Sequence, residues 1–121
     1  MTDYQKILSI DFDGVIHSYD NGWKGIDIIT DTPVKGAAGW LQNLIDDPDF
    51  KPVIYSSRSN DPRGIEAMKN YIRDIGVDPD DLEFPTEKPA AFMTIDDRAI
   101  CFTGVFPTRV SINNFKAWNK K

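Results

Sequence analysis

The chain contains one cysteine and one histidine among its 121 residues. A single cysteine, Cys101, cannot form an internal disulfide, so nothing points to an oxidising compartment, and we expect it to be a small buried hydrophobic residue. With so few soft ligands, a zinc site is not expected. No apolar run approaches the length of a membrane span. We therefore expect a cytoplasmic protein that does not contact a membrane.

Basic residues are also in deficit. The sequence has 14 lysines and arginines against 19 aspartates and glutamates, which gives a formal net charge of -5. Electrostatic binding of nucleic acid or of an anionic membrane over a broad surface requires a basic face, so nucleic acid is possible as a partner but is not favoured. Hydrophobic residues make up 40% of the chain, enough to fill the core of one domain spanning residues 1–121.

The most informative motif is a pair of aspartates that follows a short apolar run. Residues 7–10 are typical of a buried strand, and the next four residues are Asp11-Phe12-Asp13-Gly14. Side chains alternate along an extended segment, so we expect the Asp11 and Asp13 side chains to point the same way. Two like charges held so close require a cation between them or a proton on one. The alternative is a solvated turn with Asp13 as its cap.

Two further strands are predicted at residues 52–55 and 91–95, with weaker ones at 82–84 and 99–102. Apolar spacing of three to four predicts helices over 40–45 and 62–75, the second with Asn60 or Asp61 as its cap, and a short helix near 111–118. Asn21-Gly22 predicts a small β-hairpin flap within residues 15–31, which His17, Tyr19 and Trp23 would line mainly as packing or surface residues. Strands that alternate with helices predict an α/β fold with a mostly parallel central sheet.

Polar side chains follow each of the predicted central strands. In a parallel sheet the carboxyl ends of the strands meet at one edge, so residues far apart in sequence converge there. They are Asp11, Asp13, Ser56, Asp96 and Asp97. Converging carboxylates form a hard oxygen site that suits Mg²⁺, and an ionised aspartate beside such an ion can attack phosphorus to form an acyl phosphate. Asp11 is the better candidate nucleophile, and Asp13 can serve as general acid and base.

These residues resemble the motifs of the haloacid dehalogenase superfamily. Residues 7–15 resemble its first motif, a hydrophobic strand followed by Asp-x-Asp-Gly-Val. Residues 53–56, which end in Ser56, resemble the second motif, Lys88 resembles the third-motif lysine, and residues 94–97 resemble the acidic fourth motif. The motifs occur in family order over nearly the whole chain. The resemblance implies a three-layer Rossmann-like (HAD-like) domain.

The resemblance also implies roles for individual residues. Asp11 would be the nucleophile and a metal ligand, and Asp13 the acid and base with its carbonyl oxygen on the metal. Asp96 would be the main fourth-motif ligand, and Asp97 would bind the metal directly or through water. Ser56 would bind a phosphoryl oxygen. Lys88 would offset the phosphoryl charge, although only residues 89–95 separate it from the fourth motif, so the helix found there in most relatives is missing.

The residues after Ser56 are candidates for binding substrate. Ser57 and Arg58 follow the second predicted strand directly, and Arg58 could bind a phosphate or carboxylate group or could instead pair with Asp61. Neither place where relatives carry a cap domain has room for one, so the site would be open to water. Selection of the phosphorylated substrate, small or macromolecular, would then depend on the flap, on an oligomeric neighbour, or on a substrate large enough to cover the site itself.

The sequence therefore predicts a capless, Mg²⁺-dependent phosphatase, a phosphomonoester hydrolase that acts through an aspartyl phosphate on Asp11. A phosphatase acting on nucleic-acid ends is a variant of this hypothesis. An alternative from another class is a phospho-accepting signalling module similar to a response-regulator receiver. Receivers place their acidic pair after the first strand and the phosphorylated aspartate mid-chain, whereas here Ser56 lies mid-chain and the pair Asp96-Asp97 follows Lys88.

Overall fold

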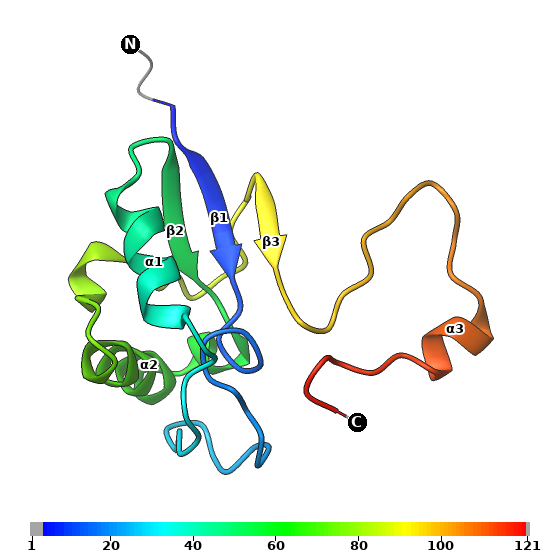
Figure 1. Cartoon of the computed structure of the whole chain (residues 1–121), viewed down its shortest axis with the longest axis horizontal. Helices are drawn as coiled ribbons and strands as arrows, with labels where there is room; N and C mark the ends of the chain where they lie inside the picture. Colours follow the sequence, from blue (N-terminus) through cyan, green and yellow to red (C-terminus); the bar gives the residue numbers. More distant parts are fainter. Residues whose placement is uncertain (1–3, 121) are drawn as a thin grey trace.

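The computed structural model describes residues 4–120 and contains a small sheet of three parallel strands. The strands are β1 (Lys6–Ile10), β2 (Phe50–Ile54) and β3 (Met93–Ile95), and they lie in the order β2-β1-β3 (Figure 1). Ile10 of β1 is in register with Ile54 of β2 and Ile95 of β3, so all three strands end at the same edge. The predicted parallel α/β architecture is confirmed at this level.

Helices α1 (Ala37–Asp46) and α2 (Pro62–Asp74) occupy the positions that the apolar spacing predicts. The Asp61 side chain caps α2 by accepting a hydrogen bond from the backbone N–H of Arg63, and Pro62 occupies the first turn. Gly76 follows the helix with φ of 102°, a left-handed conformation that glycine adopts without strain. The weak strand predicted at 82–84 is reduced to a single parallel bridge between Val53 and Glu83.

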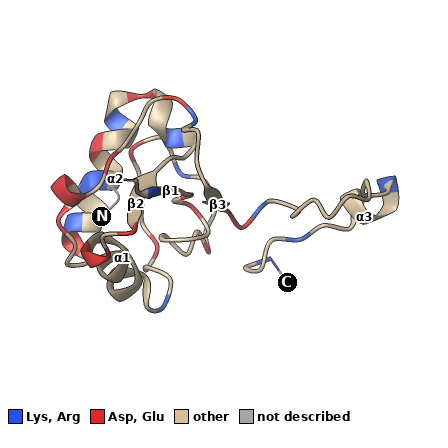
Figure 2. Ribbon diagram, turned by 90° about the horizontal axis from the view of Figure 1, so that it is seen from above, with Lys and Arg blue, Asp and Glu red and all other residues tan. Residues whose placement is uncertain are grey.

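The hydrophobic core lies on one face of the sheet. Alternate residues of β1, Leu8 and Ile10, belong to the same buried cluster as Leu41 of α1 and Met68 and Ile72 of α2. The third helix, α3 (Arg109–Asn113), stands apart from the sheet (Figures 1 and 2). Within residues 4–120, no helix therefore forms a layer on the second face, and the expected three-layer arrangement is not confirmed.

The segment after β1 is an irregular loop and not the predicted β-hairpin. The Asn21-Gly22 turn forms, with a hydrogen bond from the Gly22 N–H to the Tyr19 carbonyl at 3.1 Å, but no strand ladder follows it. The carbonyls of Gly25 and Ile26 instead accept hydrogen bonds from the buried side chain of Arg58, and this contact takes the place of cross-strand pairing. We call residues 15–31 the flap loop.

Three expectations for the end of the chain are corrected. Residues 99–102 form no strand, Cys101 is exposed, and the terminal helix covers 109–113 where 111–118 was expected. The segment leaves β3, extends away from the body and returns near the end of β1 (Figure 1). It therefore packs too little apolar surface to form the strand predicted from composition. Across residues 4–120, no helix has the length and apolar character needed to cross a membrane.

Candidate metal and active site

Asp11 is positioned by the ends of all three strands. It directly follows the central strand β1, and its backbone N–H donates to the carbonyl of Ile95 at 2.9 Å. On the other side, the N–H of Tyr55 donates to the carbonyl of Ile10 at 3.1 Å. These bonds fix the backbone of Asp11 between the ends of β2 and β3, where the sequence analysis placed it.

Three carboxylates meet at this edge of the sheet. Asp96 and Asp97 follow β3, and oxygen atoms of Asp11, Asp96 and Asp97 all lie within 4.8 Å of one another. The backbone N–H of Arg98 donates to Oδ1 of Asp96 at 2.8 Å and fixes the turn that presents the pair. We call these three residues the acidic cluster. The convergence of Asp11 with Asp96 and Asp97, predicted from sequence, is present in the structure.

The acidic cluster perturbs its own ionisation. The pKa of Asp11 is raised from 3.8 to about 8, first because the carboxyl group is buried and then because the charge of Asp96 opposes its ionisation. A hydrogen bond from the Phe12 N–H to Asp11 Oδ1 at 2.8 Å acts in the opposite direction. Burial also raises the pKa of Asp97. In the metal-free protein at neutral pH, the cluster therefore holds a proton that a cation would replace.

Two features of the cluster fit a bound cation. Oδ1 of Asp97 is buried and has no hydrogen-bond partner within residues 4–120, so a ligand position is left unused. Gly14, with φ of 87°, makes room for this carboxylate, because a Cβ added there would overlap the Asp97 carboxylate oxygens. Oxygen ligands of Mg²⁺ at about 2.1 Å stand roughly 3–4 Å apart, which the spacing of the cluster accommodates. The residues present fit a small, hard divalent ion.

The end of the chain closes one side of the cluster. Nε1 of Trp118 donates to the carbonyl of Gly14 at 2.7 Å, and the side-chain amide of Asn119 donates to the carbonyl of Ser18 at 2.8 Å. A shallow cavity of about 290 Å³ opens here, lined by Trp118, Gly14, Val15, Val34, Ile95, Asp96 and Asp97. The sequence analysis did not assign Trp118 to the site, because a lone tryptophan far along the chain carries no spacing signal.

Asp13 does not join the acidic cluster, which corrects the expectation that its carboxylate would point the same way as that of Asp11. Its Oδ2 accepts from Nε of Arg58 at 2.9 Å, and its Oδ1 accepts from Nδ1 of His17 at 2.9 Å and from Arg58 at 3.3 Å. The strand ends at Ile10, so strict alternation stops before Asp13. Nε2 of His17 accepts from the N–H of Asp31 at 3.0 Å, which leaves the ring proton on Nδ1 for Asp13.

Arg58 is fully buried and links Asp13 to the flap loop. Besides Asp13, its guanidinium donates to the carbonyls of Gly25 and Ile26 at 2.7 and 2.8 Å, and it stacks on the Trp23 ring at 4.5 Å. Asp61, the other partner considered for Arg58, pairs instead with Arg63. Arg58 was a candidate for binding a phosphate or carboxylate group, and in the structure its donors hold Asp13 and the flap loop together.

The other predicted site residues, Ser56, Ser57 and Lys88, lie in three different surroundings. Ser56 follows β2 at the same edge of the sheet, is buried, and accepts from the Arg58 N–H at 3.0 Å, so its own hydroxyl proton is free to point elsewhere. Ser57 is exposed in the adjoining short 3-10 helix Ser57–Asn60. Lys88 is exposed in the loop before β3 and makes no hydrogen bond or ion pair within the described part of the chain. The structure thus does not bring Lys88 to the cluster through a direct contact.

Searches against protein-family models, curated proteins and solved structures gave no match for this chain.

Proposed function

We propose that this protein is a Mg²⁺-dependent phosphomonoester hydrolase that works through an aspartyl phosphate on Asp11. The observation that carries the proposal is the convergence of Asp11, Asp96 and Asp97 at the carboxyl edge of a parallel sheet, within 4.8 Å of one another. Asp11 directly follows the central strand, and the Oδ1 atom of Asp97, which has no hydrogen-bond partner within residues 4–120, offers a ligand position beside it. The resemblance of the four motifs to the haloacid dehalogenase superfamily supports the same chemistry.

The reaction proceeds in two displacements. A carboxylate oxygen of Asp11 forms a bond to phosphorus while the bond from phosphorus to the ester oxygen breaks, and Asp13, after taking up a proton from solvent, gives that proton to the leaving alcohol. Water then attacks phosphorus, Asp13 takes a proton from that water, and the bond to Asp11 breaks to release inorganic phosphate. A hydroxyl group such as that of Ser56, at the same sheet edge, donates to a phosphoryl oxygen.

The bonds around Asp13 set a condition on this role. Both carboxylate oxygens of Asp13 are occupied, one by Arg58 and one shared between His17 and Arg58. Transfer of a proton by Asp13 therefore requires one of these bonds to open. The weakest by length is the 3.3 Å contact to Arg58, and its loss leaves the 2.9 Å bonds to His17 and to Nε of Arg58 in place.

A divalent cation would be held by Asp11, Asp96 and Asp97. When bound, the ion supplies charge that offsets the phosphoryl oxygens and the ionised nucleophile. It also favours the ionised form of Asp11, which is the nucleophilic form, against the burial that raises its pKa to about 8. The acidic cluster without a counter-charge would repel a phosphate dianion, so activity requires the cation.

Hydrolysis of a generic aryl phosphate with and without Mg²⁺ tests the proposal. Asp11→Asn keeps the shape of the side chain but removes the nucleophile, so we expect turnover to fall by roughly a thousandfold or more. Asp20→Asn, at an exposed position of the flap loop, is the matched control and should leave turnover unchanged. Full activity of Asp11→Asn would refute the proposal. A phosphorylated protein that persists for minutes without releasing phosphate would favour the receiver-like alternative.

A further inference from the structure

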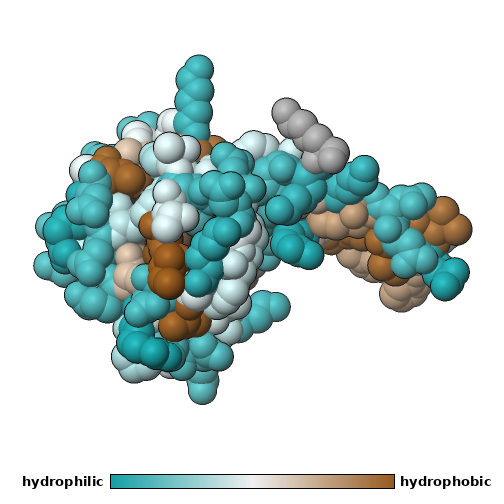
Figure 3. Space-filling model, turned by 90° about the horizontal axis from the view of Figure 1, so that it is seen from below, coloured by the Kyte–Doolittle hydropathy of each residue, from teal (hydrophilic) through white to brown (hydrophobic). Residues whose placement is uncertain are grey.

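Residues 98–116 form an apolar projection that leaves the body of the protein, which we call the arm. Val105, Phe106 and Val110 are 78%, 82% and 66% exposed, and Phe102 and Ile112 are also exposed. The rings of Phe102 and Phe106 contact each other at a tilt of 44°, with centroids 5.0 Å apart, and neither contacts another aromatic ring within residues 4–120. The space-filling view shows hydrophobic surface on the arm, in addition to patches on the body (Figure 3). Contiguous exposed apolar surface of this kind marks an interaction site.

The sign of the formal charge also changes where the arm begins. Residues 98–121 contain five lysines and arginines and no acidic residue, whereas residues 1–97 contain nine basic and nineteen acidic residues. The formal charge is therefore +5 on the terminal segment and -10 on the body. Figure 2 shows the same division, with red confined to the body and blue alone along the arm. The surface that complements the arm is acidic, and the body of another copy has that charge.

The exposed area is large enough for a stable contact. The accessible surface of the chain is 8027 Å². A folded monomer of 13.7 kDa exposes about 6,600 Å², so roughly 1,400 Å² is in excess. A standard protein interface buries about 800 Å² on each partner. The excess surface of one chain therefore exceeds the area that each partner buries in a specific interface.

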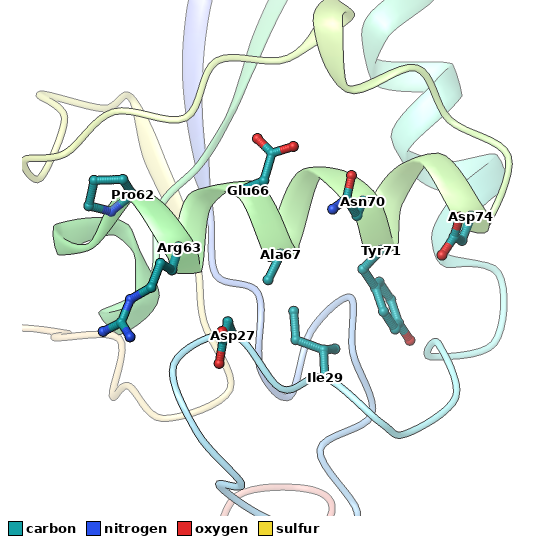
Figure 4. A pocket seen from close by; sticks show the side chains of 9 residues that line it. All are labelled: Asp27, Ile29, Pro62, Arg63, Glu66, Ala67, Asn70, Tyr71 and Asp74. Atoms are coloured by element: carbon teal, nitrogen blue, oxygen red, sulfur yellow. The ribbon is translucent and has the colours of Figure 1, made fainter.

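An acidic groove on the body offers a complementary surface. It has a volume of about 600 Å³ and lies between α2 and the flap loop, with Ile29, Ala67 and Pro62 among its lining residues (Figure 4). Three acidic side chains, Asp27, Glu66 and Asp74, surround it, and Arg63 is its one basic residue. The groove thus combines apolar contacts with negative charge, the inverse of the charge on the arm.

The arm cannot reach the groove of its own chain. It is tethered on one side to β3 and on the other by the hydrogen bond from Trp118 to Gly14. Figures 1 and 2 show α3 of the arm and α2 of the groove at opposite ends of the molecule. Contact between these two surfaces therefore requires a second molecule.

We propose that the protein self-associates, with the arm of one copy docking in the acidic groove beside α2 of another. Reciprocal docking in a two-fold dimer uses both arms and both grooves. The arm's mixture of aromatic residues and arginine among aliphatic side chains matches the core of protein interfaces. Nucleic acid and anionic membranes are disfavoured as occupants, because the -10 charge of the body next to the arm repels them.

Sedimentation equilibrium of the full chain over a range of concentrations tests the proposal. The wild-type protein should show the mass of two chains, and the double variant Val105→Ser, Phe106→Ser should weaken association at least about tenfold. Both positions are highly exposed, so the body should fold unchanged, as far-ultraviolet circular dichroism would verify. Phe92→Ser, a similarly exposed apolar residue on the body, is the matched control and should associate as the wild type does.

Charge reversal identifies the groove as the docking site. Arg109→Glu on the arm and Glu66→Lys in the groove should each weaken self-association, and mixing the two variants should restore a dimer that contains one chain of each. Lys35→Glu, exposed and outside both surfaces, controls for the change in net charge. The proposal is overturned if the wild type sediments as one chain throughout, if arm and control variants behave alike, or if the monomer binds anionic vesicles or an oligonucleotide through the arm instead.

Discussion

Replacing Asp11 by asparagine should stabilise the metal-free protein while abolishing its activity. The substitution keeps the size and planarity of the side chain but removes a carboxyl group whose ionisation is opposed by burial and by the charges of Asp96 and Asp97. The structure raises the pKa of Asp11 from 3.8 to about 8, chiefly through burial. Because the folded protein holds this proton more tightly than the unfolded chain, the wild type loses stability as pH rises from about 4 to about 8.

The size of the effect follows from the shift. Between the unfolded pKa of 3.8 and neutral pH, each pH unit costs the folded state about 1.4 kcal/mol, which gives about 4 kcal/mol at pH 7. This is an upper limit, because Asp96 is exposed and can move away from the new charge. We therefore expect Asp11→Asn to raise the free energy of unfolding by about 1–4 kcal/mol at neutral pH. Near pH 4 the two proteins should differ little.

Urea unfolding in the presence of a chelator, at several pH values between about 4 and 8, measures this difference directly. The wild type should lose stability with rising pH, and Asp11→Asn should show a much flatter profile. Adding Mg²⁺ should restore the wild type at the upper end, because the ionised carboxylate is the ligand, and should have a smaller effect on the variant. Parallel pH profiles for the two proteins would refute the assignment of the raised pKa to Asp11.

Three further variants probe separate parts of the site. Gly14→Ala should weaken Mg²⁺ binding at least about tenfold and lower the free energy of unfolding by about 1–3 kcal/mol, because the new methyl group overlaps a carboxylate of the acidic cluster. Gly22 also has a positive φ but has open space around it, so Gly22→Ala is the control and should leave the Mg²⁺ affinity unchanged in isothermal titration. Arg58→Lys should destabilise by about 3–5 kcal/mol in urea unfolding, because lysine cannot reproduce the buried fork of hydrogen bonds, whereas Arg63→Lys at an exposed pair should cost no more than about 0.5 kcal/mol. Equal losses for the two arginine variants would contradict the structural role of Arg58. Lys88→Ala should lower kcat about tenfold or more with unfolding free energy changed by less than about 0.5 kcal/mol, as expected of an exposed lysine that acts only when substrate binds; an unchanged kcat would remove Lys88 from the site.

The strongest parts of the fold were predictable because local and long-range signals agree there. The apolar run before Asp11 forms the central strand, and the Asp61-Pro62 pair begins α2 where capping chemistry places it. Once β1 and β3 are parallel and adjacent, their carboxyl ends must lie at the same edge of the sheet. For this reason, the meeting of Asp11 with Asp96 and Asp97 could be inferred from sequence alone.

The parts that could not be predicted depend on side-chain partners that are distant in sequence. Nothing near Arg58 shows that its guanidinium would be buried against Asp13 and the carbonyls of the flap loop, 45 and about 32 residues away. That contact both turns Asp13 out of the cluster and prevents the predicted hairpin. The strand expected at 99–102 fails for a related reason, because composition favours a strand but no neighbouring strand pairs with it.

The most direct test of the central claim is to identify the phosphorylated residue during turnover. The protein is mixed with Mg²⁺ and an aryl phosphate, quenched in acid within the first turnover, and mapped by peptide mass spectrometry. We predict one phosphoryl group, on the peptide that contains Asp11, absent when Mg²⁺ is omitted and absent in Asp11→Asn. Substrate hydrolysis with the phosphoryl group on another residue, or with the same rate in Asp11→Asn, would contradict the account.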